Sequence, residues 1–301
     1  MNNKDGEPEL ESALAECSRL SEENARLRDL LTRYGISPDP PPETGNIRDG
    51  NAAAAATVNS QSPPEVKLAL FRSLFRGRED VYAVRWEAKD GRSGYSPAGL
   101  RDWNAVLSSR PQDRRRVDRE TRQLLPLTDE VIRRHLLGKH TAGIYPLLLD
   151  ETCWLLAVDF DKSTWQADAA IYLAACRELG VSAGLERSRS GNGGHVWLFF
   201  DRPIPACRAR MLGCTLLTRS LERRHQIGLD SYDRFFPNQD TLPKGGFGNL
   251  IALPLQKGPR EQGNSVFVDA EFRPYPDQWQ YLSSLARVPA ELVEALVQEA
   301  T

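Results

Sequence analysis

Hydrophobic positions follow two different periods along this chain, and together they predict a mixed α+β fold. Apolar residues recur at helical spacing in some segments and form short strand-like runs in others. The helical segments are residues 65–75, 128–138, 163–179 and 205–224, and the strand-like runs are residues 81–86, 153–158, 183–187 and 196–200. The order strand, helix, strand, strand, helix after residue 150 predicts a sheet with helices packed on it. We therefore expect one α+β domain over residues 64–301.

The N-terminal segment has a different pattern. Residues 7–34 carry small or apolar side chains at alternating spacings of three and four, with Asn24 at a central position. This pattern predicts a short coiled-coil helix that forms a weak dimer or binds a partner helix, and the alternative is a lone amphipathic helix. Residues 35–63 are rich in Pro, Ala, Asn and Ser, a composition that cannot build a core, so we expect a flexible linker.

Charge and cysteine content limit the possible functions. The net charge of the 301 residues is −2, but residues 1–63 hold 6 basic and 11 acidic side chains, which leaves the remainder at +3. No apolar run is long enough to span a membrane, and no signal peptide is visible. The five cysteines are scattered, which fits a reducing cytoplasm and predicts no structural zinc.

Two aspartates follow the strand-like run at residues 153–158. Asp159 and Asp161 are separated by one residue, and side chains at such positions of a strand point to the same face. Two carboxylates side by side repel each other unless a cation lies between them. Mg²⁺ and Mn²⁺ prefer such oxygen ligands, so the pair predicts a metal site, whereas a solvated strand end is the alternative.

A turn rich in Ser, Gly and Asn comes next and joins two predicted strands. Its candidate phosphate-binding residues are Arg187, Ser188, Arg189, Ser190, Asn192, Gly193 and His195. Glycine lets backbone amides approach an anion, and guanidinium groups bind phosphate with two donors. The segment therefore predicts a site for a nucleotide triphosphate. The alternative is an ordinary glycine-rich hairpin with a surface histidine.

Two further features extend the predicted site. Asp230 follows an apolar stub, and a third carboxylate would complete a site for two ions, although a turn aspartate is the alternative. Lys244 lies in a second glycine-rich loop that lacks the spacing of a P-loop. A lysine on such a loop can reach a triphosphate, and a mobile surface loop is the alternative.

The order of these motifs resembles that of the archaeo-eukaryotic primases, the Prim-Pol superfamily. The motifs are Asp159 with Asp161, then Gly193-Gly194-His195, then Leu229-Asp230. Residues 70–78, 127–136, 186–193 and 230–240 resemble more closely the primase domain of TOTE conflict systems and CRISPR-associated Prim-Pol proteins. The resemblance covers about residues 64–287. It implies an RRM-like catalytic sheet, two Mg²⁺ or Mn²⁺ ions held by Asp159, Asp161 and Asp230, and a triphosphate held by His195 and nearby basic residues.

The same resemblance implies a DNA-directed primase-polymerase that uses a single-stranded DNA template, a primer and dNTP or NTP. Two other classes stay open. A metal-dependent nuclease needs the same ions but no triphosphate pocket, and a non-catalytic nucleic-acid-binding adaptor needs no set of three acids. A glycosyltransferase fits the first motif alone.

One segment departs from the family pattern. Relatives often carry a small cysteine cluster before residue 125, whereas residues 110–122 of this chain hold six arginines, three acids and no cysteine. Arg114, Arg115 and Arg116 predict a basic patch for template phosphates, because each neutralised phosphate adds salt-sensitive affinity. The alternative is a solvated loop or helix face.

Overall fold

The computed structural model describes residues 57–222 and 230–300, together with residues 19, 22, 25 and 26. The chain divides into two units, Met1–Ala54 and Ala55–Thr301. The predicted coiled-coil helix lies almost entirely outside the described residues, so its pairing stays a prediction. Of the predicted linker, residues 57–63 are described, and there the backbone of Val58 and Ser60 is hydrogen-bonded to the side chains of Ser283 and Asp277.

The larger sheet has five strands in the order β11-β7-β8-β6-β9, and every neighbouring pair is antiparallel. Its elements are β6 (Thr152–Phe160), α6 (Trp165–Glu178), β7 (Gly184–Arg187), β8 (Gly194–Pro205), α7 (Ala206–Glu222), β9 (Tyr232–Phe236) and β11 (Val266–Phe267). The first strand of this β-α-β-β-α-β unit, β6, lies between the third and the fourth, which is the RRM-like arrangement. Both the α+β class and the RRM-like sheet are therefore confirmed.

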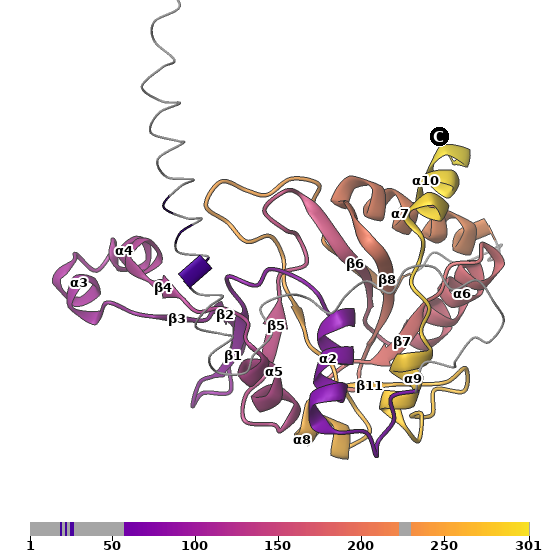
Figure 1. Cartoon of the computed structure of the whole chain (residues 1–301), viewed down its shortest axis with the longest axis horizontal. Helices are drawn as coiled ribbons and strands as arrows, with labels where there is room; N and C mark the ends of the chain where they lie inside the picture. The colour runs from indigo at the N-terminus through magenta and orange to yellow at the C-terminus, as the bar shows by residue number, and fades with distance from the viewer. Residues whose placement is uncertain (1–18, 20–21, 23–24, 27–56, 223–229, 301) are drawn as a thin grey trace, which may run out of the picture. The chain divides into compact units, whose positions relative to one another are not determined.

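A smaller sheet of four strands has the order β10-β5-β1-β2, and α2 stands between it and the larger sheet (Figure 1). The elements of this part are α2 (Pro64–Leu74), β1 (Ala83–Glu87), β2 (Ser93–Pro97), α5 (Asp129–Leu136), β5 (Ala142–Ile144) and β10 (Ile251–Ala252). Three helices complete the domain: α8 (Lys257–Glu261), α9 (Gln278–Ser284) and α10 (Ala290–Glu299). Within the described residues, no helix is both long enough and apolar enough to cross a membrane.

The two faces of the larger sheet are covered differently. Helices α6 and α7 cover one face, where Phe160 contacts Tyr172 at 5.6 Å between ring centroids. The opposite face is covered in part by α2 and the residue after it. Phe75 packs edge-on against Trp197 and Phe199, with centroid distances of 5.0 and 5.3 Å. The next polar positions along β6 and β8 lie beyond this apolar cover.

Residues 99–124 form a separate projection that we call the arm. It contains β3 (Gly99–Leu100), α3 (Trp103–Ser108), α4 (Arg114–Thr121) and β4 (Gln123–Leu124), and β3 pairs with β4 at its base. Figure 1 shows the arm extending away from both sheets. The arginine-rich segment, for which the sequence left loop and helix open, contains helix α4.

Candidate active site

One row of polar residues crosses the face of the larger sheet that α6 and α7 leave open. Glu186 on β7 is opposite His195 on β8, His195 is opposite Asp159 on β6, and Asp159 is opposite Arg234 on β9. Residues directly opposite each other in antiparallel strands point to the same face. We call these four residues the polar row. The register therefore brings together side chains that are far apart in the sequence.

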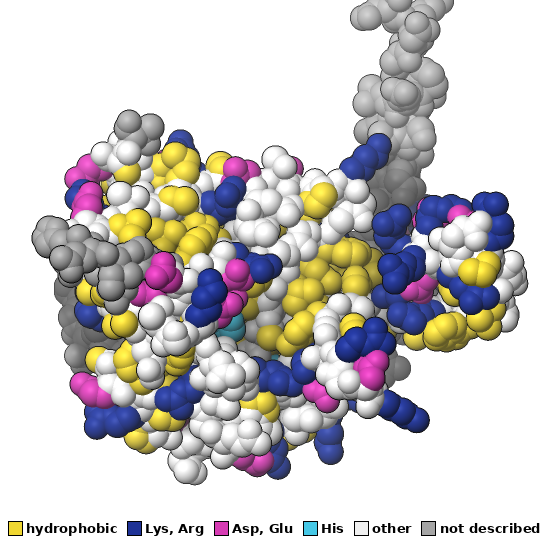
Figure 2. Space-filling model, turned by 180° about the vertical axis from the view of Figure 1, so that it is seen from behind, with side chains coloured by type: hydrophobic (Ala, Val, Ile, Leu, Met, Phe, Trp, Pro, Cys, Tyr) yellow, Lys and Arg dark blue, Asp and Glu magenta, His cyan; other side chains and the backbone are white. Residues whose placement is uncertain are grey.

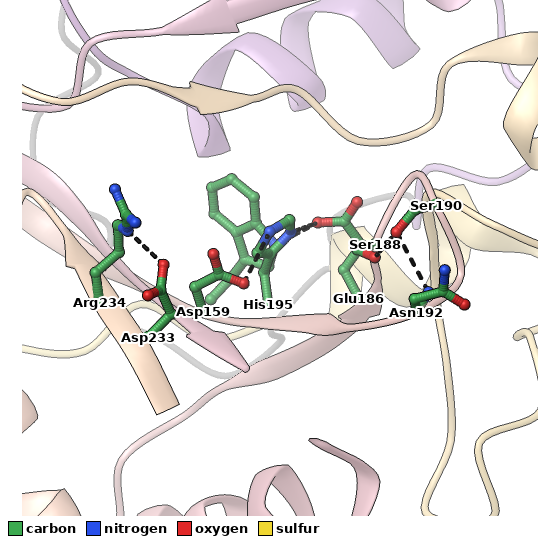
Figure 3. Close-up of polar contacts among 9 residues, drawn as sticks. Asp159, Glu186, Ser188, Ser190, Asn192, His195, Asp233 and Arg234 are labelled. Carbon is green, nitrogen blue, oxygen red and sulfur yellow. Dashed lines mark hydrogen bonds and ion pairs between the residues drawn. The ribbon is translucent and has the colours of Figure 1, made fainter. Parts of the chain in front are cut away.

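The centre of the polar row is His195, which is held from both sides (Figure 3). Its Nδ1 lies 2.9 Å from Oε2 of Glu186, and its Nε2 lies 3.6 Å from Oδ1 of Asp159. The same Glu186 oxygen accepts a hydrogen bond from Nε1 of Trp197 at 2.8 Å. Glu186 is only 2% exposed, so its carboxylate is fixed by these two donors and orients the imidazole ring. Sequence analysis gave Glu186 no role.

The charges of the row change the protonation of its members. Burial alone lowers the pKa of His195, but the carboxylates of Glu186 and Asp159 outweigh this effect and raise the pKa above its ordinary value. Burial raises the pKa of Asp159, and the charges of Asp233 and Asp161 raise it further against His195 and Arg234. The site therefore favours a positively charged His195. The negative charge of the carboxylates around it is only partly compensated.

A pocket of about 740 Å³ opens at this end of the sheet. It brings together seven of the fourteen predicted site residues, namely Asp159, Asp161, Ser188, Ser190, Asn192, Gly193 and His195. Lys162, Ser163, Trp165 and Gly191 complete the lining. Gly193 approaches the end of β6 so closely that a Cβ atom there would lie 2.6 Å from the carbonyl oxygen of Phe160. A glycine at this position thus lets the turn lie directly beside the aspartates.

The turn leaves fewer backbone amides free to bind an anion than the sequence suggested. The amide of Ser188 donates to the carbonyl of Gly193, and the amide of Gly191 donates to that of Ser188. The amide of Asn192 donates to Oγ of Ser190 at 3.3 Å. These three amides stabilise the turn itself and do not form the predicted anion site. The side chains of Ser188, Ser190 and Asn192 line the pocket and carry its remaining donors from the turn.

The two predicted arginines have different surroundings. Arg187 does not line the pocket, and its guanidinium donates to the carbonyl oxygens of Gly263 at 2.9 Å and of Phe272. Arg189 donates to Glu87 at 3.3 Å, and Arg85 contacts the same carboxylate. Burial and the positive charge of Arg189 lower the pKa of Arg85. Two guanidinium groups that share one carboxylate retain a positive charge.

The position of the third acid differs from the sequence prediction. Asp230 is exposed and does not line the pocket, and its backbone oxygen accepts a hydrogen bond from Lys162 Nζ at 3.0 Å. Asp233 lies at a β-bulge of β9, next to Arg234, and Figure 3 shows it beside Asp159. Burial is the main cause of the raised pKa of Asp159, and the negative charge of Asp233 adds to it. Asp233 is also exposed and also lies outside the pocket lining, but the pairing of β9 with β6 brings it to Asp159. This pairing favours Asp233 over Asp230 as the third carboxylate.

A buried serine fixes β9 relative to these acids. The backbone amide and hydroxyl of Ser231 both donate to Asp168 of α6, at 3.2 and 2.6 Å, and both residues are fully buried. The carbonyl of Ser231 accepts from the amide of Asp161 at 2.8 Å. Ser231 thus connects the end of β6 to the beginning of β9.

The predicted triphosphate-binding lysine lies elsewhere. Lys244 is exposed on the loop between β9 and β10 and does not line the pocket.

Whether the acids fit a metal ion can be tested on their surroundings. In the described part of the chain, no three His, Cys, Asp or Glu side chains already form a group that could hold an ion. However, Oδ1 of Asp161 is buried and has no hydrogen-bond partner among the described residues. A buried carboxylate oxygen without a partner is costly, and a hard divalent cation would satisfy it. Asp159, Asp161 and Asp233 therefore fit Mg²⁺ or Mn²⁺ in donor chemistry.

The RRM-like sheet, with acids and a histidine on its open face, agrees with the primase-polymerase class that the motif order predicted. A family model described as "TOTE conflict system, Archaeo-Eukaryotic Primase domain" matches residues 66–296, and the chain belongs to this family. Membership of this family supports nucleotidyl transfer as the general activity of the chain.

Among solved structures, the polymerase domain from Mycobacterium tuberculosis Ligase D in complex with DNA is similar over 77% of this chain and 86% of that chain, with 13% identity and a TM-score of 0.35. No curated protein matches the chain.

Proposed function

We propose that this chain is a DNA-directed primase-polymerase that joins nucleotides on a single-stranded DNA template. One observation carries the proposal: the polar row and the serine-glycine turn meet at one pocket beside a buried, unpaired carboxylate oxygen. A pocket of about 740 Å³ is large enough for a nucleotide. The proposed substrates are dNTP or NTP and the end of a primer. The proposed location of the protein is the cytoplasm.

The acids are assigned to metal binding. Asp159, Asp161 and Asp233 would hold two Mg²⁺ or Mn²⁺ ions, and Asp233 replaces Asp230 in this role because it lies beside Asp159. When bound, such ions supply charge neutralisation at the attacking and leaving oxygens of a phosphoryl transfer. Ser231 holds Asp161 and Asp233 in register by connecting β6, β9 and α6.

The positively charged groups are assigned to the triphosphate. His195 Nδ1 donates to Glu186, and in the protonated imidazole Nε2–H is a second donor that faces the pocket. A charged imidazole at this place neutralises a phosphate oxygen and fixes its position. Ser190 and Asn192 add neutral donors from the turn. Arg189 and Arg85 do not line the pocket, but they share the carboxylate of Glu87 and would provide the remaining positive charge near it. The contacts of Arg187 with backbone carbonyls give no support for a role there.

The first experiment measures incorporation of labelled nucleotides on single-stranded DNA, with and without a primer, in Mg²⁺ or Mn²⁺. Products without a primer would establish a primase, and extension of a primer alone would establish a polymerase that does not initiate. Asp159→Asn is the matched control and should incorporate nothing. Folded protein that yields no product in either assay would overturn the proposal. Metal-dependent degradation of the DNA would instead favour a nuclease, and binding alone would favour an adaptor.

A further inference from the structure

The positive charge of the domain is concentrated in the arm. Residues 99–124 contain seven arginines and four acids, a net charge of +3. The rest of residues 64–301 holds 26 basic and 26 acidic side chains, so the arm accounts for the entire positive excess. Figure 2 shows the arm at the right, with Lys and Arg side chains gathered over it beside hydrophobic ones. A local patch of this kind attracts polyanions although the whole chain is slightly acidic.

The arginines of the arm fall into two groups. Four are paired with acids: Arg101, Arg110, Arg116 and Arg122 contact Asp118, Asp113 or Glu120. Arg114, Arg115 and Arg119 form no ion pair with any residue that the structure describes, and we call them the free arginines. Arg115 and Arg119 are one turn apart on α4, so they lie on the same side of the helix. Of the predicted patch, Arg114 and Arg115 are free and Arg116 is neutralised.

The arm also exposes apolar side chains. Trp103 is 56% exposed, and Leu100 and Leu107 are 60% and 61% exposed. The guanidinium of Arg101 lies 5.3 Å from the centre of the Trp103 ring, and its Nε lies 3.3 Å from Asp118 of α4. Arg101 thereby connects the tryptophan to the helix that carries the free arginines. An exposed aromatic ring next to arginines is the combination that binds unpaired bases and their phosphates.

We propose that the arm binds single-stranded nucleic acid, with phosphates on the free arginines and a base stacked on Trp103. Paired bases in a duplex are stacked on each other and do not offer a face to the indole ring, so the exposed tryptophan favours a single strand. The further statement that this strand is the template of the reaction rests on the proposed function. Binding itself requires neither metal nor catalysis, so the two proposals can fail separately.

The test uses the full chain and a labelled single-stranded DNA, with binding measured by fluorescence anisotropy in EDTA at several salt concentrations. Arg115→Ala/Arg119→Ala removes two free arginines, and Arg110→Ala/Arg116→Ala removes two paired ones from the same arm. The first variant should weaken binding by about tenfold and reduce the salt slope by about 1.4, or about 0.7 for each lost phosphate contact. The second should stay within about twofold, because its arginines are already neutralised.

Equal losses in the two double variants would mean that only overall charge matters, and no loss in either would mean that the strand binds elsewhere. Both results would overturn the proposal. Circular dichroism should be the same for all variants, since alanine favours the helix.

A second pair of variants tests stacking. Trp103→Ala should weaken binding of the single strand by about tenfold, the effect of losing one stacked base, whereas Leu107→Ala removes an equally exposed apolar side chain without a ring and should change little. Equal effects of the two variants, or tighter binding of duplex than of single-stranded DNA, would contradict the proposal. A chain that binds through the arm but incorporates no nucleotide would overturn the proposed function and leave the arm's role intact.

Discussion

The polar row and the arm both carry charge, but they carry it in opposite ways. In the polar row, His195 contacts Glu186 and Asp159 on the two neighbouring strands, and Glu186 is almost completely buried. In the arm, the free arginines have no ion-pair partner among the described residues, and Trp103 is more than half exposed. Both regions belong to the same unit of the chain.

This difference suits the two regions to two different functions, catalysis and capture of a strand. Catalysis requires groups whose positions are fixed before the substrate arrives, which is achieved by burial and mutual hydrogen bonds. Capture of a long polyanion requires exposed charges that tolerate many positions of the strand and respond to salt. We therefore expect changes in the polar row to act on turnover, and changes in the arm to act on template affinity and its dependence on salt.

The largest effect is expected from the central acid. Asp159→Asn should lower turnover by at least about a hundredfold, because charge stabilisation by a metal ion is worth several kcal/mol. The melting temperature at neutral pH should stay equal or rise, because a carboxyl whose pKa is raised by burial destabilises the fold once it is ionised. Incorporation assays and thermal unfolding of the same preparations test both statements. Unchanged turnover would remove Asp159 from the site.

A comparison of two aspartates decides the third carboxylate. Asp233→Asn should lower turnover by about a hundredfold, the order expected when a charged group that stabilises the transition state is lost. Asp230→Asn should stay within a few-fold of the unmodified chain, because Asp230 precedes β9 and lies outside the pairing that brings Asp233 to Asp159. The same incorporation assay with both variants makes the measurement. The reverse result would restore the prediction made from the sequence.

A smaller effect is expected at Glu186, which acts through His195. Glu186→Gln should reduce turnover by about tenfold to a hundredfold, since a hydrogen bond to a charged group is worth about 1.5–3 kcal/mol. Loss of the negative charge should also lower the pKa of His195, so activity should decline at a lower pH than in the unmodified chain. The pH–rate profile tests this. Reduced activity without a shift of the alkaline limb would mean that Glu186 only supports folding.

The smallest effect is expected at the connection between β6 and β9. Ser231→Ala removes one donor from the buried carboxylate of Asp168 and should lower the free energy of unfolding by about 1–3 kcal/mol. Ser108→Ala on the exposed side of α3 is the control and should stay within about 0.5 kcal/mol. Urea unfolding gives both values. Equal stability of the two variants would show that Ser231 does not fix the register of β9.

Local patterns were enough for the parts of the site that lie within one hairpin or one strand end. Asp159 and Asp161 follow a recognisable apolar run, and the serine-glycine turn joins two recognisable strands. The structure brings both to one pocket. The same reasoning could have found Glu186. Counting the same number of residues from the turn along β7 and along β8 places Glu186 opposite His195.

Other parts depend on contacts that no local pattern encodes. Asp233 reaches Asp159 through the pairing of β9 with β6 and through a bulge in that pairing, and a shift of one residue would have placed it on the other face. The guanidinium of Arg187 looked suitable for phosphate until its contacts with Gly263 and Phe272 were known. Helix α4 lacks an apolar stripe, so its sequence did not separate a helix from a solvated loop.

The two strands at the base of the arm make it an exchangeable segment. Gly99 pairs with Leu124, so the chain leaves the domain and returns to it at neighbouring points. A segment that begins and ends at the same place can be lengthened, shortened or exchanged while β2 and α5 keep their positions. Replacement of this one segment would change the surface that captures a strand and leave the polar row in place.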